Sequence, residues 1–155
     1  MGNMFRDELE DRAVQRYRNL ICSLKVCQQD VQILHRHLIG ETFISNHEFL
    51  EGVYKELAEM VDELAELGIT LNVKEPSISS CIQYKTPITV ESRDIVETMN
   101  ELCKCCELLY EEMDDLKNES SVPTDVVSKI DEYQLKLRSF AVYKANQVLR
   151  GAKIF

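Results

Sequence analysis

Apolar residues recur at helical spacing along most of the chain, and this pattern predicts four helices. The predicted helices span about residues 4–38, from 41–45 to 67, 89–117, and from 123–124 to just before Gly151. Gly40 interrupts the pattern between the first two helices, and Gly68 is a typical residue for ending the second. We see no alternation of apolar and polar residues long enough to predict a β-strand.

Residues 68–88 form a long connection between the second and third predicted helices. Within it, Pro76 is followed by SISSCIQY, which predicts a short helix with proline at its start. Helices joined in the order helix–helix, long connection, helix–helix describe a four-helix bundle with one crossover. We therefore expect an all-α chain in which residues 1–155 form a single domain.

The net charge of −9 restricts the kinds of partner that we expect the protein to bind. An acidic surface repels phosphate, and neither end carries a lysine-rich tail, so direct DNA binding is not expected. No apolar run approaches the roughly 20 residues that span a bilayer. The start, MGNMFRDELEDR, lacks the pattern of a secretory signal, and we expect a cytoplasmic protein without a membrane segment.

Six cysteines are expected to remain thiols in a reducing compartment. Cys103, Cys105 and Cys106 form the sequence CKCC, whose spacing raises the possibility of a metal site. On a helix, however, Cys103 and Cys106 share a face while Cys105 points elsewhere, and no histidine is nearby in sequence. Buried thiols are the favoured interpretation, because free cysteine packs as a small apolar residue.

All three histidines lie between positions 35 and 47, around Gly40, in the sequence HRHLIGETFISNH. His47 and Glu51 are four residues apart and share one helix face, as do Asp62 and Glu66. Asp62 is eleven positions after Glu51, which on a helix returns to within about 20° of the same direction but about 16 Å farther along the axis. The four side chains form one stripe, and no single metal can be held by both pairs from one helix.

Two interpretations of this stripe remain open. The pairs are independent, or a second copy of the helix lies antiparallel and brings its Asp62 and Glu66 beside His47 and Glu51. In the second case His35 supplies another imidazole, and two nitrogens with three carboxylates suit iron or manganese, with zinc also possible. An ordinary solvated face is the alternative. No Glu-x-x-His pair signals a di-iron site within one subunit.

The spacing of these residues resembles the ferroxidase signature of the Dps-like miniferritins. The pattern is His35-x4-Gly40-x2-Phe43-x3-His47-x3-Glu51-x10-Asp62-x3-Glu66, without insertion. Weaker similarity extends to the helix lengths, the short-helix connection and YQLKLRSF near the end. The resemblance implies a ferritin-like four-helix bundle, twelve of which form a hollow shell with iron sites at twofold interfaces.

By this resemblance, His35, His47 and Glu51 come from one subunit, and Asp62 and Glu66 come from its neighbour. It implies binding of Fe(II), its oxidation by hydrogen peroxide or oxygen, storage of the ferric product in the shell, and protection against oxidative damage. The alternative is a ferritin-like helical scaffold, or a metal-binding protein that does not oxidise iron, with a weakened site.

Several residues depart from the pattern of the family. Glu51 stands where the family usually has Asp, and Leu67 replaces a frequent Arg. Arg36 replaces a Trp that traps oxidising equivalents in the family. Tyr17 and Tyr54 are the candidate substitutes for that Trp, although core packing is the favoured role for both. His37 matches no ligand of the family, and at two residues from His35 its side chain is expected to point away from the site. The termini lack the basic segments with which members of the family bind DNA.

Overall fold

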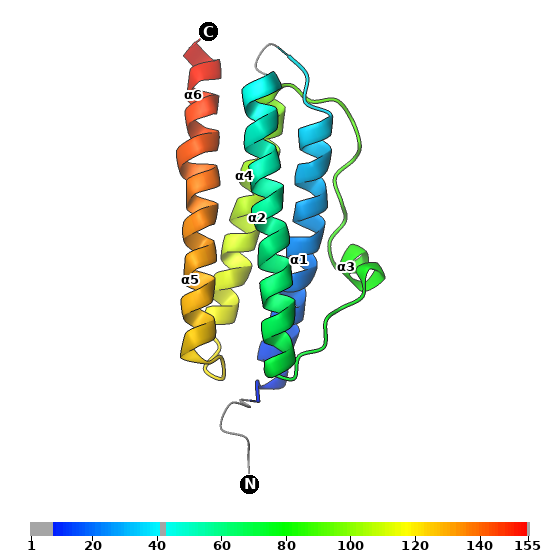
Figure 1. Ribbon diagram of the computed structural model, residues 1–155, viewed down its shortest axis with the longest axis vertical. Coiled ribbons are helices and arrows are strands. Elements are labelled where there is room, and N and C mark those ends of the chain that lie inside the picture. The colour runs from blue at the N-terminus through cyan, green and yellow to red at the C-terminus, as the bar shows by residue number, and fades with distance from the viewer. Residues whose placement is uncertain (1–7, 41–42, 155) are drawn as a thin grey trace.

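Helices account for nearly all of the regular structure in the computed structural model, which describes residues 8–40 and 43–154 (Figure 1). The elements are α1 (Asp11–Arg36), α2 (Phe43–Thr70), α3 (Ile78–Tyr84), α4 (Ile95–Lys117), α5 (Thr124–Arg138), the π-helical segment η1 (Ser139–Ala145) and α6 (Asn146–Ile154). α5, η1 and α6 follow one another without a break and form the fourth long helix. Within the described residues, the only β-type pairing is an isolated bridge between Leu38 and Arg93.

The four long helices lie side by side, and the crossover between α2 and α4 runs along the outside of α1 and carries α3 (Figure 1). The predicted all-α bundle with one crossover is therefore confirmed. The short helix predicted after Pro76 is also confirmed, but proline does not start it: the helix begins at Ile78, and the side chain of Ser77 caps it by accepting a hydrogen bond from the Ser80 N–H. None of the helices in the described residues combines the length and apolar character that crossing a membrane requires.

Gly68 does not end the second helix as predicted, because α2 continues to Thr70. Its role is close packing: a Cβ at this position would lie 3.2 Å from Tyr17 Cε1 and 3.4 Å from the Val73 carbonyl oxygen. Asn72 takes the left-handed conformation just after the helix, with φ of 58°. The residue that allows the chain to turn is therefore four positions later than the glycine that suggested it.

Other predicted boundaries are wrong by a few residues at both ends of the bundle. α1 starts at Asp11 rather than near residue 4; residues 4–7 lie outside the described residues, and the Glu10 N–H donates to Ser121 Oγ at 3.1 Å. α4 starts at Ile95 rather than 89 because backbone hydrogen bonds tie Arg93 to His37 and Ile39 at the α1–α2 turn. α6 continues past the predicted end to Ile154, since one glycine in a helix costs only about 1 kcal/mol.

The π-helical segment has a signal in the sequence that the four-helix prediction did not use. Buried residues follow at four-residue steps, at Leu137, Ala141, Ala145 and Leu149. In an α-helix four residues rotate the side-chain direction by about 40° more than a full turn, so residues at this spacing drift away from one face. A π-helical turn, with its i→i+5 hydrogen bonds, contains more residues and reduces this drift. The wider turn therefore keeps the four side chains directed toward the core.

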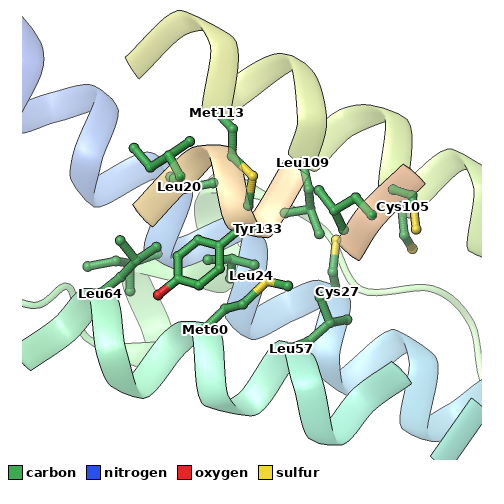
Figure 2. Close-up of a cluster of buried hydrophobic side chains, with 14 of the residues drawn as sticks. Leu20, Leu24, Cys27, Leu57, Met60, Leu64, Cys105, Leu109, Met113 and Tyr133 are labelled. Carbon is green, nitrogen blue, oxygen red and sulfur yellow. The ribbon is translucent and has the colours of Figure 1, made fainter. Parts of the chain in front are cut away.

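Side chains from all four long helices meet in the core (Figure 2). The labelled members are Leu20, Leu24 and Cys27 of α1; Leu57, Met60 and Leu64 of α2; Cys105, Leu109 and Met113 of α4; and Tyr133 of α5. All six cysteines are free thiols; five are buried and Cys103 is partly buried. The interpretation of the cysteines as packed thiols is therefore confirmed, and burial raises the pKa of Cys103 and, further, that of Cys106.

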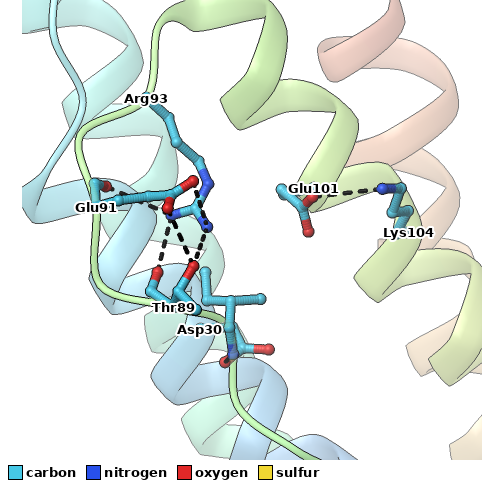
Figure 3. Close-up of polar contacts among 7 residues, drawn as sticks. Asp30, Thr89, Glu91, Arg93, Glu101 and Lys104 are labelled. Atoms are coloured by element: carbon cyan, nitrogen blue, oxygen red, sulfur yellow. Dashed lines mark hydrogen bonds and ion pairs between the residues drawn. The ribbon is translucent and has the colours of Figure 1, made fainter.

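Asp30 is a fully buried carboxylate that fastens the crossover to α1. Its Oδ1 accepts a hydrogen bond from the Ile88 N–H at 3.0 Å, while Oδ2 has no hydrogen-bond partner among the described residues. Figure 3 shows Asp30 beside the segment that carries Thr89 and Arg93. Burial raises the pKa of Asp30 above 3.8, against the opposing effects of the Ile88 hydrogen bond and Lys85.

Replacing Asp30 with Asn is expected to stabilise the protein at neutral pH. Because the pKa of Asp30 is higher in the folded chain, unfolding releases a proton, and the free energy of unfolding falls as the pH rises above the usual aspartate pKa of 3.8. Asp30→Asn keeps an acceptor for Ile88 without the buried charge, and should raise the free energy of unfolding by about 1 kcal/mol at pH 7. The gain should vanish below pH 3.8, as followed by urea unfolding at both pH values. Asp30→Ala, which removes the acceptor, should be less stable than Asp30→Asn throughout.

Candidate metal centre

The turn between α1 and α2 brings His35 and His47 face to face. Their ring centroids are 3.6 Å apart and the ring planes differ by 21°. Each ring is hydrogen-bonded to the backbone of the other residue: His35 Nδ1 to the His47 carbonyl oxygen and His47 Nδ1 to the His35 carbonyl oxygen, both at 2.8 Å. The two bonds form a reciprocal pair that orients both rings.

These hydrogen bonds determine the tautomer of both imidazoles. A carbonyl oxygen only accepts hydrogen bonds, so each Nδ1 must carry the hydrogen. A neutral imidazole has one N–H, and its lone pair then lies on Nε2. This is the arrangement of many metal-binding histidines, in which a backbone carbonyl accepts from one ring nitrogen and the other nitrogen binds the metal. When the two imidazoles are neutral, their Nε2 atoms are therefore the ring nitrogens that carry the lone pairs.

The ring of His35, the more buried of the two histidines, also contacts an aromatic side chain. The Tyr54 ring meets His35 edge-on, with centroids 5.2 Å apart and planes at 69°. His35 is 8% exposed, whereas His47 is partly exposed. Of the two tyrosines considered as substitutes for the missing Trp, Tyr54 lies beside a histidine, while Tyr17 is buried in the core and donates to the Leu64 carbonyl oxygen at 2.6 Å.

Glu51 lies one helical turn after His47, on the outer side of α2. Its carboxylate forms an ion pair with Lys55, with 2.8 Å between Oε1 and Nζ. The hydrogen bond and charge of Lys55 lower the pKa of Glu51, against the opposing effect of burial. The carboxylate is therefore ionised at neutral pH.

Asp62 and Glu66 lie farther along α2, exposed on the same outer side. They border a shallow hollow of about 300 Å³. Its other lining residues are Ala58, Val61, Ala65 and Ile69 of α2, and Glu75 of the crossover. Ile69 is 78% exposed, which leaves an apolar surface beside the two carboxylates.

The structure pairs His35 with His47 and places Asp62 and Glu66 beside one hollow, but it does not bring the five predicted ligands together. Within the described residues, no three His, Cys, Asp or Glu side chains come close enough together to hold a metal ion. α2 is one continuous helix, so the eleven positions from Glu51 to Asp62 keep these two carboxylates about 16 Å apart along its axis, too far for one metal. A complete five-ligand site would require a second subunit.

His37 lies outside the stacked pair and contributes through its backbone. Its N–H donates to the Ile33 carbonyl oxygen and its carbonyl oxygen accepts from the Arg93 N–H at 3.2 Å. The Arg93 guanidinium, almost fully buried, donates to the Thr89 carbonyl oxygen at 3.1 Å and contacts the Glu91 carboxylate (Figure 3). These contacts fasten the histidine-bearing turn to the crossover.

Sequence reasoning missed two features near the histidines. One is Lys55, whose four-residue spacing from Glu51 is a visible signal for an ion pair on a helix. The other is Arg93, which lies far from the histidines in sequence and has no such signal. Its position shows only once the crossover is folded against the α1–α2 turn.

Comparison with solved structures identifies the fold. No protein-family model matches the sequence, and no curated protein matches it. The structure is similar to the DPS protein of Vibrio cholerae O1, described as a member of a broad superfamily of ferritin-like diiron-carboxylate proteins, with a TM-score of 0.82 and 19% identity over 96% of this chain and 99% of that one. It is also similar to antigen TpF1 of Treponema pallidum, with a TM-score of 0.81 and 19% identity over 92% of this chain and 97% of that one.

A C-terminal deletion mutant of Mycobacterium smegmatis Dps is a third similar structure, with a TM-score of 0.79 and 15% identity over 89% of this chain and 97% of that one. Agreement along nearly the whole of both chains confirms the ferritin-like four-helix-bundle fold that the sequence resemblance implied. The chain has the fold of the Dps-type miniferritins.

Proposed function

We propose that this protein binds Fe(II) at sites shared between two subunits and oxidises it with hydrogen peroxide or oxygen. The observation that carries the proposal is the reciprocal hydrogen bonding of His35 and His47, which directs the lone pair of each neutral ring to Nε2. Glu51, one helical turn after His47 on α2, adds a carboxylate in this proposal. We propose that these two imidazoles and this carboxylate are brought onto the metal when a second subunit completes the site, a donor set suited to a borderline divalent metal such as Fe(II).

The remaining ligands are Asp62 and Glu66 of a second subunit in this proposal. An antiparallel partner that places its Glu66 opposite His47 also places its Asp62 opposite Glu51, because both pairs of residue numbers add up to 113. The twofold axis then passes between positions 56 and 57, and two identical sites form, one on each side of it. The exposed Ile69 beside Asp62 and Glu66 is the kind of apolar surface that such a contact would cover.

Iron is the substrate of the proposed reaction. Two Fe(II) ions supply two electrons, and one hydrogen peroxide molecule with two protons accepts them to give two Fe(III) ions and two water molecules. Three carboxylates at each site offset the added positive charge of the ferric product. In line with the family resemblance, we propose that twelve subunits form a shell that stores this product in the cytoplasm and limits oxidative damage, without binding DNA directly.

A second candidate function is a helical scaffold, or a protein that binds zinc or manganese without oxidising iron. The Glu51–Lys55 ion pair favours it, because a ligand carboxylate that is already paired with a cation binds a metal less strongly. Arg36, exposed next to His35, adds a further positive charge near the site.

One experiment separates these functions: addition of Fe(II) and hydrogen peroxide to the purified protein, with ferric absorbance and particle mass followed together. The proposal expects a multimer that oxidises Fe(II) faster than buffer does. A multimer that binds Co(II) or Zn(II) but oxidises Fe(II) at the buffer rate would support the second candidate. A monomer without accelerated oxidation would contradict the proposal.

A further inference from the structure

Among the five proposed ligands, Glu51 differs from the other carboxylates in having a cation already in contact with it. Lys55 Nζ lies 2.8 Å from Glu51 Oε1. Within the described part of the chain, neither Asp62 nor Glu66 takes part in an ion pair. The ammonium group therefore pairs with the one proposed carboxylate ligand that follows His47 by a single helical turn.

We propose that Lys55 is a specificity-determining residue, which holds Glu51 in the metal-free protein and so selects metals that bind imidazole over Mg²⁺ and Ca²⁺. This inference rests on the proposed function, because it concerns the same site. Mg²⁺ and Ca²⁺ bind almost entirely through oxygen, and Glu51 is the single carboxylate that this half of the site offers them. A metal such as Fe(II) or Co(II) binds the Nε2 atoms of His35 and His47 as well, and it gains enough from them to displace the ammonium group.

The size of the effect follows from the exposure of the pair. The side chains of Lys55 and Glu51 are 65% and 39% exposed, so water screens their attraction, and the ion pair alone changes an equilibrium constant by about twofold. The positive charge of Lys55 also repels an incoming divalent ion, which raises the total to roughly three- to tenfold. The larger value applies to Mg²⁺, which depends on the carboxylate for its binding to this half of the site.

The test uses Co(II), which does not oxidise under these conditions, on the full-length protein and three variants. In Lys55→Gln, the dissociation constant should fall about threefold for Co(II) and about tenfold for Mg²⁺. The Mg²⁺ concentration that displaces half of a saturating amount of Co(II) should therefore fall about threefold. Lys55→Arg keeps the cation and should behave like the unmodified protein. Lys104→Gln is the matched control, because Lys104 is 72% exposed and pairs with Glu101 at 3.4 Å on α4.

The outcomes separate this inference from the proposed function. Equal Co(II) affinity and equal Mg²⁺ sensitivity in Lys55→Gln and the unmodified protein would overturn the role of Lys55 and leave the metal site intact. A change of the same size in Lys104→Gln would also overturn it, because the effect would then reflect net charge. If neither protein binds Co(II), the proposed metal site is wrong, and the role of Lys55 falls with it.

Discussion

Replacing either His47 or Asp62 with Ala is expected to slow iron oxidation by about 100-fold or more, because each change removes a ligand from every site. Both residues lie at the outer side of α2, with His47 partly exposed and Asp62 exposed, so neither change opens a cavity in the core. Circular dichroism should therefore show unchanged helix content, and particle mass should stay the same. The measurement is the initial rate of ferric absorbance after addition of hydrogen peroxide.

A mixture of the two variants tests whether the ligands come from different subunits. In a mixed pair of His47→Ala and Asp62→Ala subunits, one site has lost both ligands and the other has all five. Random pairing of equal amounts makes half of the pairs mixed, so about a quarter of the sites should be intact and about a quarter of the activity should return. Co-assembly by joint refolding, or by co-expression with different tags, supplies the mixture.

The matched control mixes His47→Ala with His35→Ala. These two histidines stack on one another within one subunit, so they belong to the same half of every site. Each site in a mixed pair then lacks one histidine, and no activity should return. Restoration in this control, or its absence in the mixture of His47→Ala and Asp62→Ala, would contradict a site shared in the proposed way.

The helices were predictable from sequence because their apolar residues face one core. The wrongly predicted helix boundaries lie where a residue contacts a segment that is distant in the sequence. Gly68 looks like a helix end, but Tyr17, distant in sequence, packs against its bare Cα. The start of α4 is displaced because Arg93 pairs with the α1–α2 turn. Neither contact has a local signal, since each depends on how two separate segments come together.

The candidate site was predictable to a similar extent. Residue spacing alone predicted that His47 and Glu51 are separated from Asp62 and Glu66, and α2 carries all four residues on one continuous helix. The tautomer of the histidines was beyond the sequence, because it depends on the positions of two backbone carbonyl groups across the turn at Gly40. The pairing with a second subunit stays a prediction, and it requires a small side chain at Ala58 of α2.

Ala58→Arg is expected to abolish assembly across the twofold axis and, with it, iron oxidation. In the proposed antiparallel register the axis passes between positions 56 and 57, so Ala58 of one subunit lies opposite Lys55 of the other. A small side chain at 58 permits close approach of the two helices. Arginine adds bulk and a charge of the same sign as Lys55, and the symmetry repeats the clash twice in each pair.

The strength of this test is that all five proposed ligands remain in place. Arginine is a good helix former and Ala58 is partly exposed on α2, so the subunit itself should keep its helix content and its stability to within about 0.5 kcal/mol. Analytical ultracentrifugation should show loss of the twofold contact, and Fe(II) should be oxidised at the buffer rate. Asn100→Arg, an exposed substitution on α4, is the control for added charge and should keep assembly and oxidation. If Ala58→Arg subunits still oxidise Fe(II), the site does not form across α2 in this register, because the two halves cannot meet past the larger side chain.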